Sequence, residues 1–504
     1  MTNRSVPWIT RLVVPSTLAF AAVLACAGPT SAQVNSTLSS PDAAPVMPNP
    51  VSPSTGPDLT LQLDQTGQRP LPLPTGARLT LKDAIAIALQ YHPSVAQAAA
   101  ESGAAEEQVG AARSYLGPQL YGVTEYLRTT DNGIGNTSYN NFSDVFPRLT
   151  GTNHDLPSGD TEKSWNTSNN YANGLALSQY LLDFGRRRGF VKQRRFEAAA
   201  TRDEQQLVNL DLIFEVSQRY FDVLQTRQLT RVYEQAVEED RKSHLREAQL
   251  KASAKLRPQY DVYLTEAELE RAQLHLAQAR NAEADAIVAF YNALGLGGTT
   301  PGYQLVDVFT YSRITDNMNS LVRDALRLRP DMNALENQAH AMGAQIVEYR
   351  SDYLPTVNAV AGYSALGTGL PVANNFNVGI VITWPIFNSF LTSHQVAETE
   401  LRRKAIDAQI ETLRQRIILQ VGTAFLDWQA SLQRIARADR TRAASRTQLE
   451  LANRRYAANL GDIVDLEFAQ RNYTADDAVY VNELYRFSVA KAAVDQATAR
   501  SLSR

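Results

Sequence analysis

The chain has 504 residues, of which 44% are hydrophobic and 20% are charged, and its formal net charge is −3. This length exceeds what one small core requires, so more than one structural unit is expected. The slightly acidic balance excludes the basic surface that nucleic-acid binding needs. The single cysteine, Cys26, excludes a disulfide within the chain.

The first 32 residues have the pattern of a secretory signal peptide. Arg4 and Arg11 supply positive charge, and residues 12–25 form a short apolar run. The small residues "TSA" at 30–32 then match a cleavage motif. We therefore expect residues 1–32 to be removed from the exported protein.

A second interpretation of the N-terminus stays open. The segment "VLAC" (23–26) loosely resembles a lipoprotein box, in which Cys26 would become the lipid-carrying first residue. Cleavage after residue 32 would instead remove the only cysteine together with two arginines. The mature net charge would then be about −5, from −3 minus the two positive charges.

Residues 33–78 are predicted to be a linker. They are rich in Pro, Ser, Thr and Gly, as in "PDAAPVMPNPVSPSTGPD" (41–58), and such a segment cannot bury a core. No apolar run of 18 residues follows, so no transmembrane helix is expected. Entry into a membrane would require strands that pair all their backbone groups.

The rest of the chain reads as two copies of one unit. "AIALQYHPSV" (86–95) matches "RDALRLRPDM" (323–332), and in each copy the proline is followed by another proline 25 positions later. Further pairs in the same order are Val216/Val421, Tyr220/Phe425, Asp222/Asp427 and Asp261/Asp465. We predict a first repeat at 79–298 and a second at 299–504.

The first copy contains an additional segment. Early matches are offset by 237 positions and later matches by about 205, so roughly 32 extra residues lie between Pro118 and Gly174. The segment 127–172 is rich in Asn, Ser, Thr and Gly, and is predicted to be a long surface loop. Its position suggests an external lid or a receptor surface.

Long helices dominate both copies. Residues 186–257 contain no proline and one glycine, which predicts a helix of roughly 100 Å. The second copy contains no proline after Pro385. A heptad seam runs along the first long helix at Leu207, Leu210, Phe214, Ser217, Phe221 and Leu224, apolar except at the serine. Polar helices of this length need partner helices, so a coiled-coil arrangement is expected.

Four short segments alternate with period two. In "NVGIVITWPIF" (377–387), Val378, Ile380, Ile382 and Trp384 share one face, and smaller or polar residues occupy the other. The pattern fits a membrane wall, with Trp384, Tyr180 and Phe387 at the membrane interface, or a soluble sheet covered on one side. Four strands cannot form a closed barrel, and open strand edges are excluded from lipid, so the pattern favours an oligomer.

The chain resembles the TolC-like outer-membrane efflux proteins of Gram-negative bacteria over about residues 79–500. The resemblance is carried by "LTLKDAIAIALQYHPSVAQA" (79–98), "YLGPQL" (115–120), "LSQYLLDFGRRRG" (177–189) and "RYAANLGDIVDLEFAQ" (455–470), in this order within the repeated architecture. It implies a mainly α fold with a small β part. Three copies would form a 12-stranded outer-membrane β-barrel and a helical tunnel through the periplasm.

The resemblance also implies partners and a function. The homotrimer would dock on a periplasmic adaptor (a membrane fusion protein) and on an inner-membrane pump or ABC exporter, with outer-membrane lipid around its strands. It would be a passive conduit for efflux or type I secretion. Whether it exports drugs, metals or proteins is left open by the sequence.

The last motif carries the candidate site residues. By position, Asp465 matches an acidic ring at the periplasmic aperture, and Asp462 lies three residues earlier on the same helical face. Phe468 replaces the second acid of the ring. Tyr456 and Asp261 match residues that latch the closed tip, but Gly461 replaces the latch arginine. The alternative is that Asp462 is an N-cap and Asp465 a first-turn acid.

An enzyme is not expected. The six histidines are scattered, without an i,i+4 pair of histidines or a metal-ligand spacing, and no phosphate-binding or nucleophile motif occurs. We therefore predict neither a metal nor a cofactor. The competing non-catalytic hypothesis is a soluble or lipid-anchored periplasmic coiled-coil scaffold or adaptor, which would lack the recurring apolar strand pair.

Overall fold

A computed structural model describes residues 73–130, 167–298, 301–307, 317–367 and 373–500. All of them belong to one compact unit, Leu61–Arg504. The predicted signal peptide, Cys26, residues 33–72 of the linker and most of the long loop lie outside the described residues.

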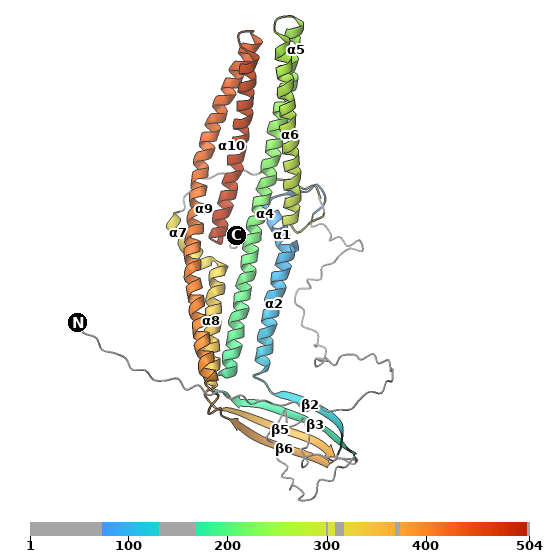
Figure 1. Ribbon diagram of the computed structural model, residues 1–504, viewed down its shortest axis with the longest axis vertical. Coiled ribbons are helices and arrows are strands. Elements are labelled where there is room, and N and C mark those ends of the chain that lie inside the picture. The colour runs from blue at the N-terminus through green and yellow to red at the C-terminus, as the bar shows by residue number, and fades with distance from the viewer. Residues whose placement is uncertain (1–72, 131–166, 299–300, 308–316, 368–372, 501–504) are drawn as a thin grey trace, which may run out of the picture. The chain divides into compact units, whose positions relative to one another are not determined.

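The first half contains short helices, a strand pair and long helices (Figure 1). In chain order its elements are β1 (Arg78–Leu79), α1 (Leu81–Tyr91), α2 (Pro93–Ser114), β2 (Gln119–Thr130), β3 (Thr167–Leu182), α4 (Arg186–Glu239), η1 (Asp240–Leu245), α5 (Arg246–Ser253) and α6 (Gln259–Ala293). Local chemistry sets the starts of the short helices. Thr80 and Asp83 form a capping box on α1, and Pro93 occupies the first turn of α2.

The second half repeats this order of elements. They are β4 (Gln304–Leu305), α7 (Met318–Leu328), α8 (Pro330–Ser351), β5 (Thr356–Gly367), β6 (Ala373–Thr383), α9 (Leu391–Ala457) and α10 (Ile463–Ala497). The helices α2 and α8 each have 22 residues and each begin with proline. The helices α6 and α10 each have 35 residues. The exact repeat boundaries at 79, 298 and 504 stay a prediction.

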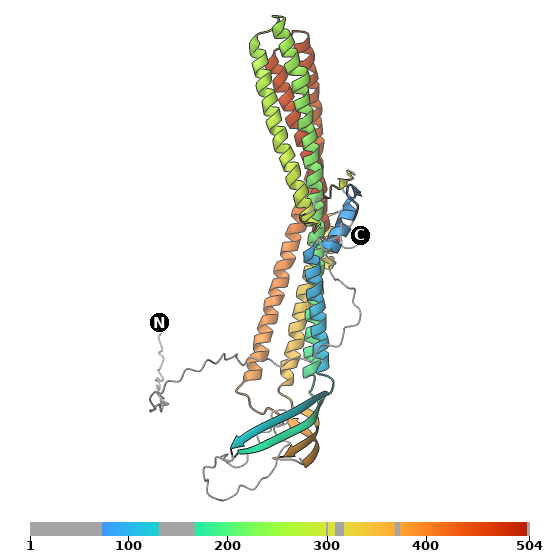
Figure 2. The ribbon, with the colours of Figure 1, turned by 90° about the vertical axis from the view of Figure 1, so that its right-hand side faces the viewer.

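The long helices pack side by side. Figures 1 and 2 show α9 beside α10 and α4 beside α6, and α4 also contacts α2, α8 and α10. The predicted helix at 186–257 is confirmed up to Ser253, but η1 is a π-helix inside it. The sequence pattern did not predict this irregularity. No helix among the described residues is long and apolar enough to span a membrane.

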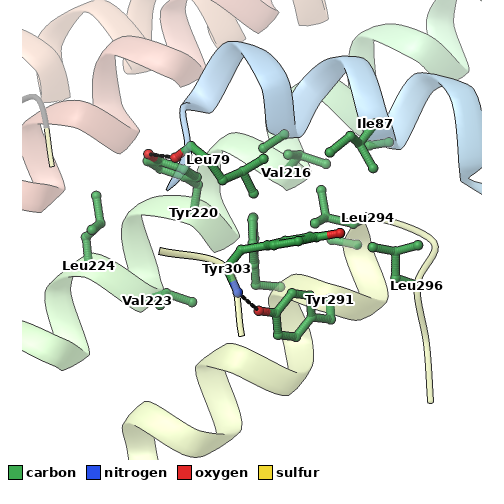
Figure 3. Packing of buried hydrophobic residues seen from close by; sticks show 14 of the residues in the cluster. Leu79, Ile87, Val216, Tyr220, Val223, Leu224, Tyr291, Leu294, Leu296 and Tyr303 are labelled. Atoms are coloured by element: carbon green, nitrogen blue, oxygen red, sulfur yellow. Dashed lines mark hydrogen bonds between the residues drawn. The ribbon is translucent and has the colours of Figure 1, made fainter. Parts of the chain in front are cut away.

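The largest apolar core lies where α1, α4 and α6 meet the two short strands (Figure 3). β1 and β4 pair in parallel, with Leu79 opposite Leu305. The hydroxyl of Tyr220, on α4, lies 3.0 Å from the Leu79 carbonyl oxygen and 2.7 Å from that of Val306, to which it donates. This tyrosine therefore joins both strands to the long helix.

The second sheet has four antiparallel strands in the order β2-β3-β5-β6. The predicted loop boundaries were wrong, because β2 continues to Thr130 and β3 begins at Thr167. Their pairing runs out to Thr130 opposite Thr167. A backbone ladder needs no apolar side chains, so the polar residues at 128–130 and 167–170 extend the strands into what composition suggested was loop.

Candidate functional site

The turn between α9 and α10 ends one helix and caps the next. Asn459 has a left-handed φ of 59°, and the Leu460 N–H donates to the Arg455 carbonyl oxygen at 2.8 Å. Asp462 is the N-cap of α10, and its Oδ1 accepts from the Ile463 N–H at 2.7 Å. The predicted turn and the predicted helix start are confirmed.

Gly461 is favoured by close backbone contact. A Cβ at this position would lie 3.0 Å from the Arg455 Cβ and 3.2 Å from the Tyr456 nitrogen. An arginine here, which the resemblance implies, would crowd that turn of α9. The guanidinium of Arg257, from the turn before α6, instead donates to the Gly461 carbonyl oxygen. An arginine thus reaches this position from another segment of the chain.

A second positively charged side chain contacts the same turn. Lys251, at the end of α5, donates through Nζ to the Tyr456 carbonyl oxygen and pairs with Glu247 at 2.9 Å. Its Nζ also lies 4.0 Å from the centroid of the Tyr456 ring, within cation–π range. The α5–α6 turn and the α9–α10 turn are therefore fastened to each other by Lys251 and Arg257.

The two predicted latch residues, Asp261 and Tyr456, are both buried at this junction. Burial raises the pKa of the Tyr456 hydroxyl to about 12, and the charge of Asp261 contributes. Burial also raises the pKa of the Asp261 carboxyl, which the Arg257 cation opposes and the Asp462 charge increases. The structure thus brings Asp261, Tyr456 and Asp462 within electrostatic reach of one another, and their role as a latch stays a prediction.

The two candidate ring acids are exposed at the tip. Asp465 lies in the first turn of α10, three residues after Asp462, so both project from one side of the helix. Phe468, one step further along that side, is 51% exposed. The capping role of Asp462 is confirmed, and it is compatible with a carboxylate ring.

The four-stranded sheet has one exposed apolar face. Cross-strand register places Val378 opposite Ala361 and Leu177, and the same face continues on each strand. Its exposed large side chains include Leu120, Tyr126, Leu175, Leu177, Tyr363, Phe376, Val378, Ile380 and Ile382. The predicted alternation of 377–383 is confirmed. A contiguous exposed apolar face marks an interaction surface, for lipid or for protein.

The three predicted interface aromatics lie where the sheet joins the helices. Trp384 is 60% exposed, and its Nε1 donates to the Tyr353 carbonyl oxygen at 3.1 Å. The guanidinium of Arg187 lies 3.2 Å from the Tyr180 ring centroid. Phe387 is exposed beside Phe390. Their contact with a membrane boundary stays a prediction.

Sequence reasoning missed several residues that the fold brings together. Lys251 and Arg257 act on backbone carbonyl oxygens, which leave no residue-type signal in a sequence. Asp240, His244 and Glu467 form a buried cluster of possible metal ligands. The i,i+4 spacing of Asp240 and His244 is a sequence signal for this cluster, whereas Glu467 lies far along the chain and gives none.

Long antiparallel helices that carry a small sheet with an exposed apolar face place this chain in the class of mainly helical proteins with a sheet available for an interaction. The chain belongs to the outer membrane efflux protein family, whose model matches residues 84–296 and 321–500. It is therefore an outer-membrane efflux protein, and the resemblance inferred from its motifs is confirmed.

Individual relatives agree with this family. The chain is 26% identical to protein CyaE of Bordetella pertussis over 410 residues, covering 78% of both chains. It is 25% identical to the cation efflux system protein CusC of Escherichia coli over 367 residues, covering 68% of this chain and 77% of CusC. These relatives are matched over most of their length.

Solved structures support the fold. A structure of CusC superimposes with a TM-score of 0.69 at 20% identity, covering 83% of this chain and 91% of that one. The CmeC outer membrane channel of Campylobacter jejuni superimposes with a TM-score of 0.70 at 17% identity, covering 84% and 88%. The predicted mainly helical fold with a small β part is confirmed.

Proposed function

We propose that this chain is the outer-membrane channel of a tripartite efflux or type I secretion system, a passive conduit that carries out no catalysis. The observation that carries the proposal is the open four-stranded sheet, apolar on its exposed face, attached to helices of 54 and 67 residues. The sheet supplies the surface for lipid, and the helices supply the extension into the periplasm.

The channel is proposed to be a homotrimer. In the single chain β2 and β6 are edge strands, and unpaired edges are highly unfavourable in lipid. Three copies with four strands each would provide twelve strands, whose edges pair between neighbours. Trp384, Tyr180 and Phe387 would then lie at the lipid headgroups.

The tip is proposed to be the periplasmic aperture. Asp462 and Asp465 from three copies would surround one axis and favour cations there. Lys251, Arg257, Asp261 and Tyr456 would hold the tip closed by fastening the two turns of each copy. A periplasmic adaptor and an inner-membrane pump or ABC exporter would dock at this end, and we assign the choice of cargo to that pump.

The proposal is tested by measuring how much of the natural chain, and how much of a variant in the sheet, is found in the outer-membrane fraction. The intact chain should stay in the outer-membrane fraction after a high-salt wash and conduct ions when purified. Ile380→Arg puts a cation on the apolar face, where it should cost about 2–4 kcal/mol and reduce insertion sharply. The matched control Asn375→Arg changes the opposite face of the same strand and should insert normally.

Two outcomes would contradict this function. Release of the intact chain into the soluble periplasm would favour the coiled-coil scaffold, as would equal insertion of both variants. The mature N-terminus is determined on the same sample, because a lipid on Cys26 could also hold a scaffold at the membrane.

A further inference from the structure

A buried cluster of three side chains joins the two halves of the chain behind the tip. Asp240 and His244 lie on the π-helix η1, and Glu467 lies near the start of α10. The Nδ1 of His244 is 3.5 Å from the Asp240 Oδ1 and 3.3 Å from the Glu467 Oε1. The possible ligand atoms of all three residues lie within 4.8 Å of one another.

The cluster is closed to solvent, and its three side chains have only one another as charged partners. His244 is 1% exposed, and Asp240 and Glu467 are also buried. Within the described part of the chain, the Asp240 Oδ1, the Glu467 Oε1 and both ring nitrogens of His244 accept or donate no hydrogen bond. Buried polar groups that form no hydrogen bond of good geometry are rare and cost free energy, so a ligand shared by all three side chains would stabilise the cluster.

The charges around the cluster favour a cation. The groups that act on Asp240 are His244 and the acids Glu467, Glu268 and Glu239, with no lysine or arginine among them. Arg271 and Arg471 are near, but both pair with Glu268. A bound cation would reduce the repulsion between these buried acids.

We propose that Asp240, His244 and Glu467 bind one divalent transition-metal ion of the zinc type. Zinc binds imidazole nitrogen and carboxylate oxygen at about 2.0–2.2 Å, which sets ligand separations of about 3.3–3.5 Å in a tetrahedron. The two distances from His244 Nδ1 match these separations. Two carboxylates and a neutral imidazole also balance a divalent charge, and the fourth position is left for water.

Other cations fit this donor set less well. Calcium takes about six to eight oxygen ligands, and magnesium takes an octahedral oxygen shell that includes several waters, whereas this buried cluster offers two carboxylates and a nitrogen. Copper(I) prefers thiolate and thioether ligands, and the cluster contains neither. The proposal therefore specifies a borderline ion that accepts mixed nitrogen and oxygen ligands.

The site has a structural consequence that does not depend on channel activity. The π-helix interrupts the first long helix where Asp240 and His244 lie, and π-turns often occur at functional sites. Glu467 comes from the other half of the chain, so an ion would clamp η1 to the start of α10. Binding to the native state would then stabilise the junction between the helix pair α4–α6 and the helix pair α9–α10.

The test uses the full chain in detergent after removal of metals with a chelator. We expect calorimetry with Zn²⁺ to give one ion per chain, and Co²⁺ to give the visible absorption of a four-coordinate site. Zn²⁺ should also raise the melting temperature. His244→Gln and Glu467→Gln should each weaken Zn²⁺ binding at least tenfold and abolish the cobalt absorption.

A matched control separates this site from incidental binding. His275, on α6, is exposed and stacks on Tyr233 away from the cluster, so His275→Gln should bind Zn²⁺ like the natural chain. Equal loss in the control, or no stoichiometric binding by the natural chain, would overturn the proposal. Unchanged binding by both cluster variants would do the same. If His244→Gln does not fold, the nearly isosteric Glu467→Gln variant decides alone.

Discussion

At the scale of single residues, the tip depends on two cations that reach across to the opposite turn. Lys251 and Arg257 both donate to backbone carbonyl oxygens, those of Tyr456 and Gly461. Neither interaction requires a particular residue type at the accepting position. For this reason the motif comparison identified Asp261 and Tyr456 but not the two cations that contact the α9–α10 turn.

Arg257→Ala should loosen the α9–α10 turn. The variant loses a charged hydrogen bond at a half-buried position, worth about 1.5 kcal/mol. Amide hydrogens of residues 456–466 should therefore exchange roughly tenfold faster, as measured by mass spectrometry.

Arg241→Ala is the control for this change. Among the described residues, Arg241 pairs with Glu238, three positions earlier in the chain, and not with the α9–α10 turn. Its exchange at 456–466 should match that of the natural chain. Equal exchange in the Arg257 variant would show that this arginine does not hold the turn.

At the scale of elements, the closeness of α4 and α8 depends on one glycine. A Cβ added at Gly189 would lie 3.0 Å from the Glu348 nitrogen and 3.1 Å from the Ala344 carbonyl oxygen. Both atoms belong to the backbone of α8, so they cannot move without shifting the helix.

Gly189→Ala should therefore lower the melting temperature in detergent. Overpacking costs about 1–3 kcal/mol, which exceeds the gain of about 1 kcal/mol from the better helix former. Gly103→Ala on α2 is the counterpart, because nothing lies within 4 Å of the added Cβ. It should raise the melting temperature. A higher melting temperature in both variants would mean that α8 moves aside at little cost.

Much of the element pattern could be predicted, for identifiable reasons. The alternation of Val378, Ile380 and Ile382 predicted β6, because a sheet with one apolar face imposes period two. The π-helix η1 could not be predicted, since its residues are ordinary helix formers. Asp240 and His244 in η1 contact Glu467. The contact could not be predicted from the sequence, because Glu467 lies more than 200 residues further along the chain.

At the scale of the whole molecule, the duplication was visible before the structure because proline positions repeat at helix starts. Pro93 and Pro330 begin α2 and α8, where their missing N–H has no intrahelical partner to lose. The oligomer could be inferred only from the edges of the sheet and from the family. The aperture, and the ring that its acids would form, exist only in the proposed trimer.

The double variant Asp462→Asn/Asp465→Asn should weaken the cation selectivity of single channels and their block by multivalent cations. Asparagine keeps the N-cap of α10 while removing up to six charges from three copies. Asp407→Asn, an exposed acid on α9 away from the turn, should leave selectivity unchanged. Unchanged selectivity in the double variant would reduce both acids to helix caps.

The pairing of β1 with β4 also constrains the order in which the chain acquires its structure. Leu79 meets Leu305, and Tyr220 bonds to the carbonyl oxygens of Leu79 and Val306, so this core cannot close until the start of the second copy is present. Contacts of such long sequence separation carry a large loop-closure entropy and form slowly. The first copy, although earlier in synthesis, would thus remain incomplete until the second had begun to emerge, and a truncated chain would leave its main core exposed to aggregation.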